Sequence, residues 1–168
     1  LNSLGVKKIK FLGNLKFSES KTQKNIALNK NIEKIFKSRK IWCAASTHNG
    51  EEKICAEAHQ KLKKKYKKLL TVIIPRNVHR VNDIYKEIVD MGFKVQIHSK
   101  KSKIKKDTDI YLVDTYGETK SFFKICNTVF LGGSIVNHGG QNPLEPARLG
   151  CKILHGPNIQ NFTEVYRL

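Results

Sequence analysis

The sequence predicts an α/β fold, a Rossmann-like parallel sheet with helices on both faces. From residue 41 onward, short apolar runs rich in β-branched residues alternate with amphipathic stretches, which is the pattern of βαβ units. The chain has 168 residues, of which 39% are hydrophobic and 27% charged, so it can bury a core and is too apolar for a disordered segment. We therefore expect one globular domain built on parallel strands.

Six apolar runs predict the strands. Each run is short, and polar or glycine-containing segments separate it from the next, as expected for buried strands that alternate with helices. The runs are Ile41–Ser46, Leu69–Pro75, Lys94–Ser99, Ile110–Thr115, Thr128–Gly133 and Lys152–Pro157.

The stretches between these runs predict helices over residues 49–68, 79–91, 117–127, 142–150 and 161–168. In the first helix, Ile54, Ala58 and Leu62 recur at helical spacing while lysines fill the other faces, which predicts a surface helix with a lysine-rich outer side. The second helix carries an apolar stripe and ends before Gly92, a helix stop. Residues 99–107 are polar and lysine-rich and predict a flexible loop.

Residues 1–40 have a different character and are interpreted as a linker that arrives from an upstream part of the protein. They contain a strand-like stretch over Val6–Leu12, a turn at Gly13 and Asn14, and a helix expected over Lys24–Phe36. The chain opens with Leu1 and ends inside an amphipathic pattern without a cap, so we expect a fragment with parts missing at both ends.

The net charge of +18 is concentrated in one part of the chain. Residues 1–106 carry 27 Lys and Arg against 8 Asp and Glu, or +19, and residues 107–168 carry 5 against 6, or −1. Because 27 of the 32 basic residues are Lys, the excess is consistent with an AT-rich coding bias. The alternative is a surface that meets an anionic partner, either nucleic acid or membrane headgroups.

Several function classes lack their defining residues. No run reaches the roughly 20 apolar residues of a membrane helix, and no signal-peptide pattern opens the chain. The four cysteines form no CxxC pair and the six histidines no ligand-spaced cluster, so we expect packed, reduced thiols, no metal site and no cofactor. The chain has no GxGxxG fingerprint, no phosphate loop, no GxSxG elbow and no complete catalytic set.

The densest motif is the run from Gly139 to Pro146, Gly-Gly-Gln-Asn-Pro-Leu-Glu-Pro. Glycines let a ligand approach the backbone, Asn142 is a favoured N-cap, and the first turn of a helix attracts phosphate. The carboxylate of Glu145 can accept two hydroxyl hydrogen bonds, as a ribose would require. An ordinary capped helix after a tight turn explains the same residues.

Polar groups also follow the other predicted strands. Gly132-Gly133-Ser134 ends one strand, Ser46-Thr47-His48 another, Pro75-Arg76 a third and Asp114 through Glu118 a fourth. In an open parallel sheet these turns share the edge where ligands bind. Arg76 suits a phosphate or carboxylate, although each of these residues taken alone could be an ordinary surface group.

Seven motifs in register resemble the C-terminal half of the 3-deoxy-D-manno-octulosonic acid (Kdo) transferases of lipid A and lipopolysaccharide biosynthesis. The resemblance covers nearly the whole chain. Each motif alone is weak evidence for the family, but seven motifs in the family's order are specific evidence. The motifs are Gly13-Asn14-Leu15-Lys16, Ala45-Ser46-Thr47-His48 with Glu51-Glu52, Pro75-Arg76 with Arg80, Asp114-Thr115 with Gly117-Glu118, Gly132-Gly133-Ser134, Gly139-Gly140 with Asn142 through Glu145, and Gly156-Pro157 with Asn161-Phe162.

The resemblance implies the C-terminal domain of a GT-B glycosyltransferase, with residues 1–40 as interdomain linker and domain start and residues 41–168 as a CMP-Kdo-binding domain with a truncated end. The N-terminal domain, which would hold the lipid A precursor and the general base, is expected to be absent, and the fragment is expected to be inactive alone. The implied reaction is inverting and needs no metal. The residues implied to bind CMP are Pro75, Arg76, Tyr116, Gly117, Glu118, Asn142, Pro143, Leu144 and Glu145.

Asn77, Tyr116 and Gln141 stand where the family usually has His, Met and His. The resemblance implies a full-length protein at the cytoplasmic face of the inner membrane, a soluble fragment, and a basic surface against anionic lipid. Another GT-B sugar-nucleotide enzyme is the main alternative. A basic nucleic-acid-binding domain is less favoured, because the chain has only 5 Arg and no known nucleic-acid-binding signature.

Overall fold

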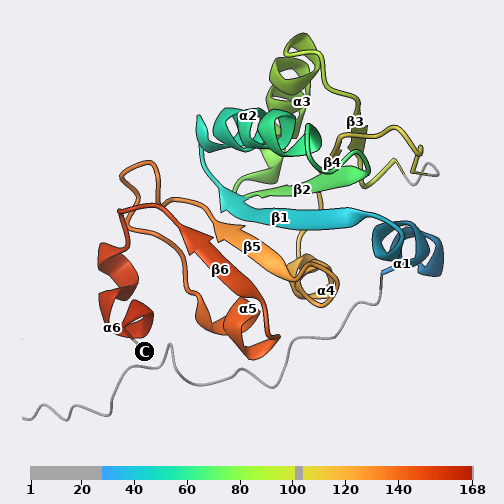
Figure 1. The fold of residues 1–168 in the computed structure, drawn as a ribbon. Helices are drawn as coiled ribbons and strands as arrows, with labels where there is room; N and C mark the ends of the chain where they lie inside the picture. The colour runs from blue at the N-terminus through green and yellow to red at the C-terminus, as the bar shows by residue number, and fades with distance from the viewer. Residues whose placement is uncertain (1–27, 101–103, 168) are drawn as a thin grey trace, which may run out of the picture.

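The computed structural model describes residues 28–100 and 104–167. Within these ranges one six-stranded sheet runs in the order β3-β4-β2-β1-β5-β6, and every neighbouring pair is parallel. This confirms the predicted α/β fold (Figure 1). The strands are β1 (Lys40–Thr47), β2 (Leu69–Pro75), β3 (Val95–Ile97), β4 (Ile110–Leu112), β5 (Thr128–Leu131) and β6 (Lys152–His155).

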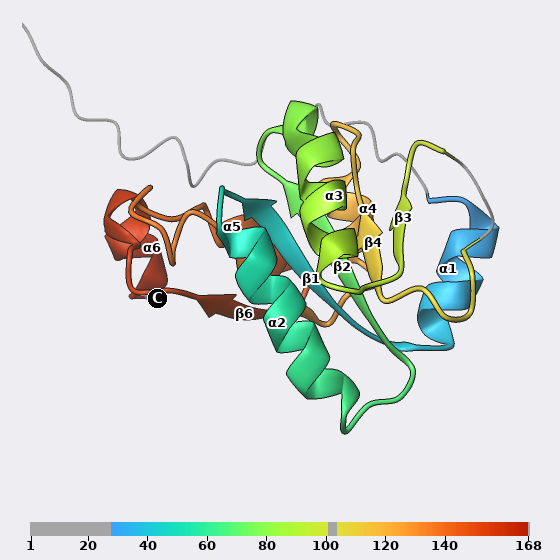
Figure 2. The ribbon, with the colours of Figure 1, turned by 90° about the horizontal axis from the view of Figure 1, so that it is seen from above.

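Helices cover both faces of the sheet, as the sequence predicted. One face carries α2 (Glu51–Lys63) and α3 (Val81–Asp90), which lie side by side over β1, β2 and β4 (Figure 2). The opposite face carries α1 (Lys30–Lys37), α4 (Thr119–Phe123) and α5 (Leu144–Arg148), and α6 (Thr163–Tyr166) lies beyond β6 (Figure 1). Two short 3₁₀ turns, η3 (Val78–Arg80) and η4 (Gln160–Phe162), precede α3 and α6.

The predicted strands all form, and β2 has the predicted bounds. β3 and β4 are only three residues each, and the residues that flank them add hydrogen bonds to side chains, from the Lys94 N–H to Asp109 and from the Ser99 N–H to Asp114. The expected strand over Val6–Leu12, the turn at Gly13 and Asn14 and the first part of the helix over Lys24–Phe36 lie outside the described residues. Within them, α1 begins after Asn29, whose side chain accepts a hydrogen bond from the N–H of Asn31 at 2.9 Å.

Two hydrophobic cores lie on the two faces of the sheet, and successive residues of each central strand contribute to them alternately. In β2, Val72 faces the core under α1 and α4, while Ile73 faces the core under α2 and α3. Phe36 of α1 and Phe122 of α4 are fully buried in the first core. Ile104 also packs there, although residues 99–107 were predicted as a polar loop without an apolar pattern.

The lysine-rich outer side predicted for α2 is present, since Lys53 and Lys61 are exposed, but the predicted apolar stripe does not form the buried face. The stripe of Ile54 and Leu62 points outward, each side chain being 40% exposed, and the buried face consists of Glu52, Cys55, Ala56 and His59. Polar side chains can occupy an inner face when hydrogen bonds satisfy them, and Glu52 and His59 both have such partners. Apolar periodicity therefore pointed to the wrong side of this helix.

His59 belongs to a polar cluster near the amino-terminal ends of β2 and β4. Its Nδ1 lies 2.8 Å from Thr71 Oγ1 and its Nε2 3.5 Å from Asp109 Oδ1, and the Lys63 ammonium pairs with the same carboxylate. Burial lowers the pKa of His59, although Asp109 opposes this shift. Burial favours the neutral form of Asp109, but the hydrogen bonds from Lys63 and from the Lys94 backbone outweigh it and lower the pKa of this carboxyl.

The four cysteines are all free thiols. Cys43, Cys55 and Cys126 are buried, and burial raises the pKa of the Cys43 and Cys55 thiols. These are packed, unreactive groups, as the sequence indicated. Among the described residues, no helix combines the length and the apolar character that a membrane crossing requires.

Candidate nucleotide site at the carboxyl edge of the sheet

The predicted strand-end groups lie at one edge because all six strands run in the same direction. The chain moves from β1 to β2 on one side and later returns to place β5 on the other side of β1. The crevice between two such neighbours is where ligands bind in doubly wound sheets. The candidate site is therefore centred on the segments that follow β1 and β5.

The turn after β5 is tied to the start of α2 by the Glu51 carboxylate. Oε2 accepts hydrogen bonds from the N–H groups of His48 at 2.9 Å and Gly133 at 2.7 Å. Oε1 accepts from Ser134 at 3.1 Å, Ile135 at 3.0 Å and Val136 at 3.4 Å. The Gly-Gly-Ser turn thus forms an anion-binding nest of backbone N–H groups.

This nest holds the protein's own carboxylate, and Glu51 is fully buried in it. The glycine at position 132 is required for the same reason, because a Cβ there would lie 2.7 Å from Glu51 Oε2 and 2.4 Å from the Ser46 carbonyl oxygen. The turn was predicted to face a ligand. The N–H groups of Gly133 and Ser134 instead bind Glu51, so they fix the loop after β5 and are not available to a phosphate.

Glu52 anchors a second set of segments at the same edge of the sheet. Its buried carboxylate accepts a hydrogen bond from Thr47 Oγ1 at 3.0 Å and pairs with the Arg80 guanidinium at 3.1 and 3.3 Å. Arg80 also donates to the Asn49 side chain at 3.1 Å. The acidic pair at the start of α2 therefore connects the segments that follow β1, β2 and β5, and the sequence singled it out only as part of a family motif, without this role.

Two histidine rings stack at this edge of the sheet. His48, which follows β1, and His138, in the loop after β5, have ring centroids 4.1 Å apart and planes inclined by 22°. His48 Nε2 is buried and has no hydrogen-bond partner among the described residues. Burial and the neighbouring His138 lower the pKa of His48, although Glu51 opposes this shift.

Pro75 and Arg76 occupy the end of β2. Pro75 is buried opposite Thr47, and the Arg76 N–H donates to the Thr47 carbonyl at 3.0 Å, which holds the turn against β1. The Arg76 side chain itself is exposed. Its guanidinium is therefore accessible to an anion at the candidate site.

Tyr116, Gly117 and Glu118 follow β4. Tyr116 is 68% exposed, and Gly117 has a φ of 83°, a left-handed conformation that favours glycine. The Glu118 carboxylate contacts His98 Nε2 at 3.0 Å and accepts a hydrogen bond from Thr115 Oγ1. The sequence singled out Glu118 but gave no indication of His98.

The helix after the Gly139-Gly140 pair is shorter than predicted. It spans Leu144–Arg148, with Pro143 at the N-cap position, and the Asn142 side chain accepts a hydrogen bond from the Leu144 N–H at 3.0 Å. Asn142 was predicted as the N-cap. Because this helix has only five residues and Asn142 already uses its first N–H, its dipole adds little attraction for phosphate.

Packing against the segment before α6 explains why residues 139 and 140 are glycines. Gly139 has a φ of 82°, and a Cβ there would lie 2.2 Å from the Asn161 side-chain nitrogen. Asn161 donates its N–H to the Gly139 carbonyl at 3.0 Å and its side-chain nitrogen to the His138 carbonyl at 2.9 Å. The pair was expected to admit a ligand, but it admits the segment that leads into α6.

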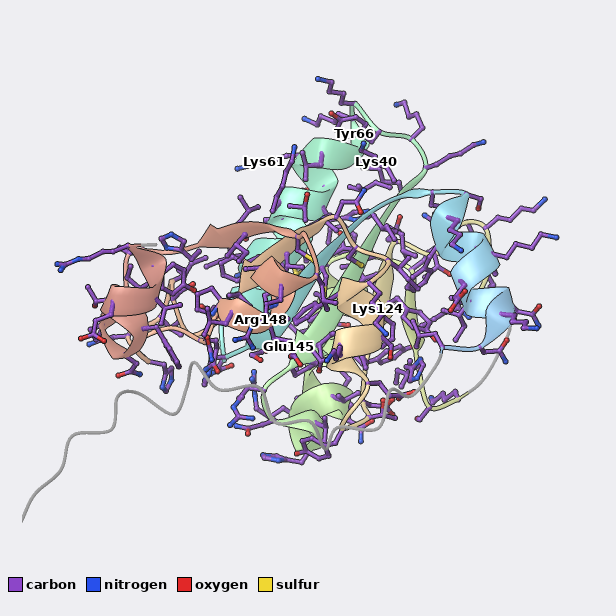
Figure 3. All side chains as sticks on the ribbon, turned by 90° about the horizontal axis from the view of Figure 1, so that it is seen from below. Lys40, Lys61, Tyr66, Lys124, Glu145 and Arg148 are labelled. Carbon is purple, nitrogen blue, oxygen red and sulfur yellow. The ribbon has the colours of Figure 1, made fainter. Side chains whose placement is uncertain are left out.

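The predicted CMP-binding residues fall into three groups along the edge. Glu118 follows β4 and Asn142 follows β5, three positions apart in the sheet, or about 14 Å at the usual strand spacing. A ligand that contacted both would lie across the ends of β2 and β1, where Arg76 is exposed. Glu145 lies on α5 with Arg148, on the same face of the sheet as Lys124 of the α4 C-terminus (Figure 3).

No protein-family model matches the chain. Named 3-deoxy-D-manno-octulosonic acid transferases do match it. The protein of that name from Haemophilus influenzae is 33% identical over 162 residues, which is 96% of this chain and 38% of the relative. The one from Aquifex aeolicus is 31% identical over 163 residues, 97% of this chain and 42% of the relative.

A solved structure is also similar, the C-terminal CMP-Kdo binding domain of WaaA from Acinetobacter baumannii. It has a TM-score of 0.74 and 28% identity, and the match covers 79% of this chain and 69% of that chain. The chain is a homologue of the Kdo transferases. It spans about two-fifths of the length of the Haemophilus and Aquifex relatives.

This Kdo-transferase homologue has the parallel α/β sheet expected from its sequence. The solved structure that it resembles is a C-terminal domain of such a protein. The match to a C-terminal domain confirms the resemblance that the seven motifs carried. The contacts assigned to individual site residues stay predictions.

Proposed function

We propose that this chain is the donor domain of a GT-B Kdo transferase, binding CMP-Kdo at the carboxyl edge of its parallel sheet. The proposal is supported above all by the placement of the Arg76 guanidinium, the Glu118 carboxylate and the Asn142 loop along this one edge. The similar solved structure is that of a CMP-Kdo binding domain, which supports the same ligand for this chain. On this proposal residues 41–168 bind the donor and residues 1–40 include the interdomain linker.

Each group has a chemical task in this proposal. Arg76 pairs with the phosphate of CMP through its planar fork and stabilises the negative charge that the phosphate carries when it leaves the sugar. Glu118 and Glu145 accept hydrogen bonds from hydroxyl groups of the nucleotide. Pro75, Tyr116, Gly117, Pro143 and Leu144 shape the surface between these charged groups.

The whole enzyme would form a glycosidic bond between Kdo and a hydroxyl of a lipid A precursor, with inversion at the sugar carbon and release of CMP. The proton of that hydroxyl would pass to a base in an N-terminal domain. This chain alone would therefore bind the donor nucleotide and not turn it over.

Calorimetric titration of the 168-residue chain with CMP tests the donor proposal, with UMP as the control for another GT-B enzyme. We expect selective CMP binding that falls at least tenfold in Glu145→Ala, about the contribution of one charged hydrogen bond. Glu57→Ala, on the exposed side of α2, is the matched control and should bind like the parent.

Tighter binding of UMP than of CMP would refute the CMP-Kdo proposal and favour a GT-B enzyme that uses a uridine sugar nucleotide. A short RNA provides the other comparison. RNA binding with steep salt dependence, without CMP binding and without an effect of Glu145→Ala, would favour the nucleic-acid alternative.

We further propose that the basic surface meets anionic lipid at the cytoplasmic face of the inner membrane. Lys40, Lys61 and Tyr66 gather where α2 ends and β1 begins (Figure 3), at the opposite end of the strands from the donor site. Lys40 and Lys65 lie 6.0 and 5.5 Å from the Tyr66 ring centre. At low salt the chain should bind phosphatidylglycerol vesicles more tightly than phosphatidylcholine vesicles, and equal binding would contradict this proposal.

A further inference from the structure

Both the backbone and the side chain of His98 are held in place. It directly follows β3, and its N–H donates to the Leu112 carbonyl of β4 at 2.9 Å, which extends the ladder by one residue. Its ring packs edge-on against Tyr111 and Phe122, with centroids 5.6 and 5.4 Å apart. The side chain is only 11% exposed, so its orientation is fixed on several sides.

Both ring nitrogens of His98 have partners. Nδ1 lies 2.8 Å from the Tyr111 hydroxyl, and Nε2 lies 3.0 Å from Glu118 Oε2. Tyr111 is buried, and burial together with the Glu118 and Asp114 carboxylates raises its pKa. A carboxylate can only accept, so the contact with Glu118 requires the imidazole proton on Nε2, and in the neutral ring Nδ1 then accepts from the Tyr111 hydroxyl.

Glu118 is held through a single oxygen. The Thr115 hydroxyl donates to Oε2, the same oxygen that His98 Nε2 contacts. Neither contact uses Oε1, and the Glu118 side chain is 17% exposed. A carboxylate fixed in this way presents its second oxygen to a ligand in a set direction and loses little side-chain entropy on binding.

We propose that His98 is a positioning residue for donor binding, which orients the Glu118 carboxylate through a hydrogen-bonded series Tyr111–His98–Glu118. This inference rests on the proposed function, because it assumes that Glu118 meets the hydroxyl groups of the CMP nucleotide. His98 touches no ligand in this arrangement and acts only through Glu118.

The test compares CMP affinities of the 168-residue chain by calorimetry. His98→Phe keeps a ring against Tyr111 and Phe122 but removes both nitrogens, and we expect CMP binding about tenfold weaker. His98→Gln retains an N–H donor near the Nε2 position and should bind within about threefold of the parent. Melting temperatures show whether each variant is folded at the temperature of the titration.

The double variant separates positioning from structural damage. In an E118A background, His98→Phe should have no further effect on CMP affinity, because no carboxylate remains to be oriented. Nitrogen-15 NMR of the parent should find His98 protonated at Nε2, with Tyr111→Phe shifting the ring toward a mixture of tautomers.

Three results would overturn the inference: unchanged CMP affinity in His98→Phe, no rescue by His98→Gln, or the same tenfold loss in the absence of the Glu118 carboxylate. In each of these the parent chain still binds CMP, so the proposed function stands. A parent chain that fails to bind CMP would refute the proposed function and this inference together.

Discussion

Replacing Glu51 by glutamine should destabilise the chain strongly although it removes no atom from the packing. The carboxylate accepts five backbone N–H donors, two at Oε2 and three at Oε1. A glutamine has one acceptor oxygen and one NH₂ group, which cannot accept. With its oxygen at either position, the NH₂ faces at least two N–H donors that lose their acceptor.

The magnitude follows from the number of lost donors. A buried donor without a partner costs about 1–3 kcal/mol, so two of them predict a loss of about 3 kcal/mol in the free energy of unfolding. With a denaturant dependence of about 2 kcal/mol per molar urea, the unfolding midpoint should fall by about 1.5 M. The carboxylate is needed here because it accepts hydrogen bonds through both oxygens.

Urea unfolding followed by circular dichroism measures the effect. Glu57→Gln makes the same chemical change on the exposed side of α2 and should stay within about 0.5 kcal/mol of the parent. If Glu51→Gln and Glu57→Gln had the same midpoint, the proposed nest of N–H groups around Glu51 would be refuted.

Two further predictions concern stability. Gly139→Ala combines a left-handed backbone with a Cβ 2.2 Å from the Asn161 side chain, and it should lower the free energy of unfolding by about 2 kcal/mol or more in the same urea assay. Gly150→Ala, at a φ of 76° with nothing within 4 Å of the added Cβ, should lower it by about 1 kcal/mol. Equal losses in the two variants would contradict the close approach of Asn161. The lowered pKa of His59 means that the unfolded chain binds its proton first, so the free energy of unfolding should fall as the pH drops below about 6.5. His59→Asn should show a shallower fall between pH 7 and 5, and equal pH dependence in the two proteins would show that His59 does not titrate in this way.

The local sequence determined the elements of this fold. The six apolar runs became six parallel strands, because short β-branched runs favour an extended backbone and those of the central strands are buried under helices on both faces. The direction of the strands then placed the groups after them at one edge, so Arg76 and Glu118 could be selected before any distance was known. The ordered motifs carried the family resemblance, because motif order along a chain is itself a property of the sequence.

The partners of buried polar groups were decided only by the tertiary structure. Glu51 and the turn it binds are more than 80 residues apart, and His98 and Glu118 are 20 residues apart. No local periodicity records such pairings, because a hydrogen bond between distant segments depends on the order of strands in the sheet. For the same reason the apolar stripe of Ile54 and Leu62 pointed to the wrong face of α2, whose inner side is polar because Arg80 and Thr71 supply partners for Glu52 and His59.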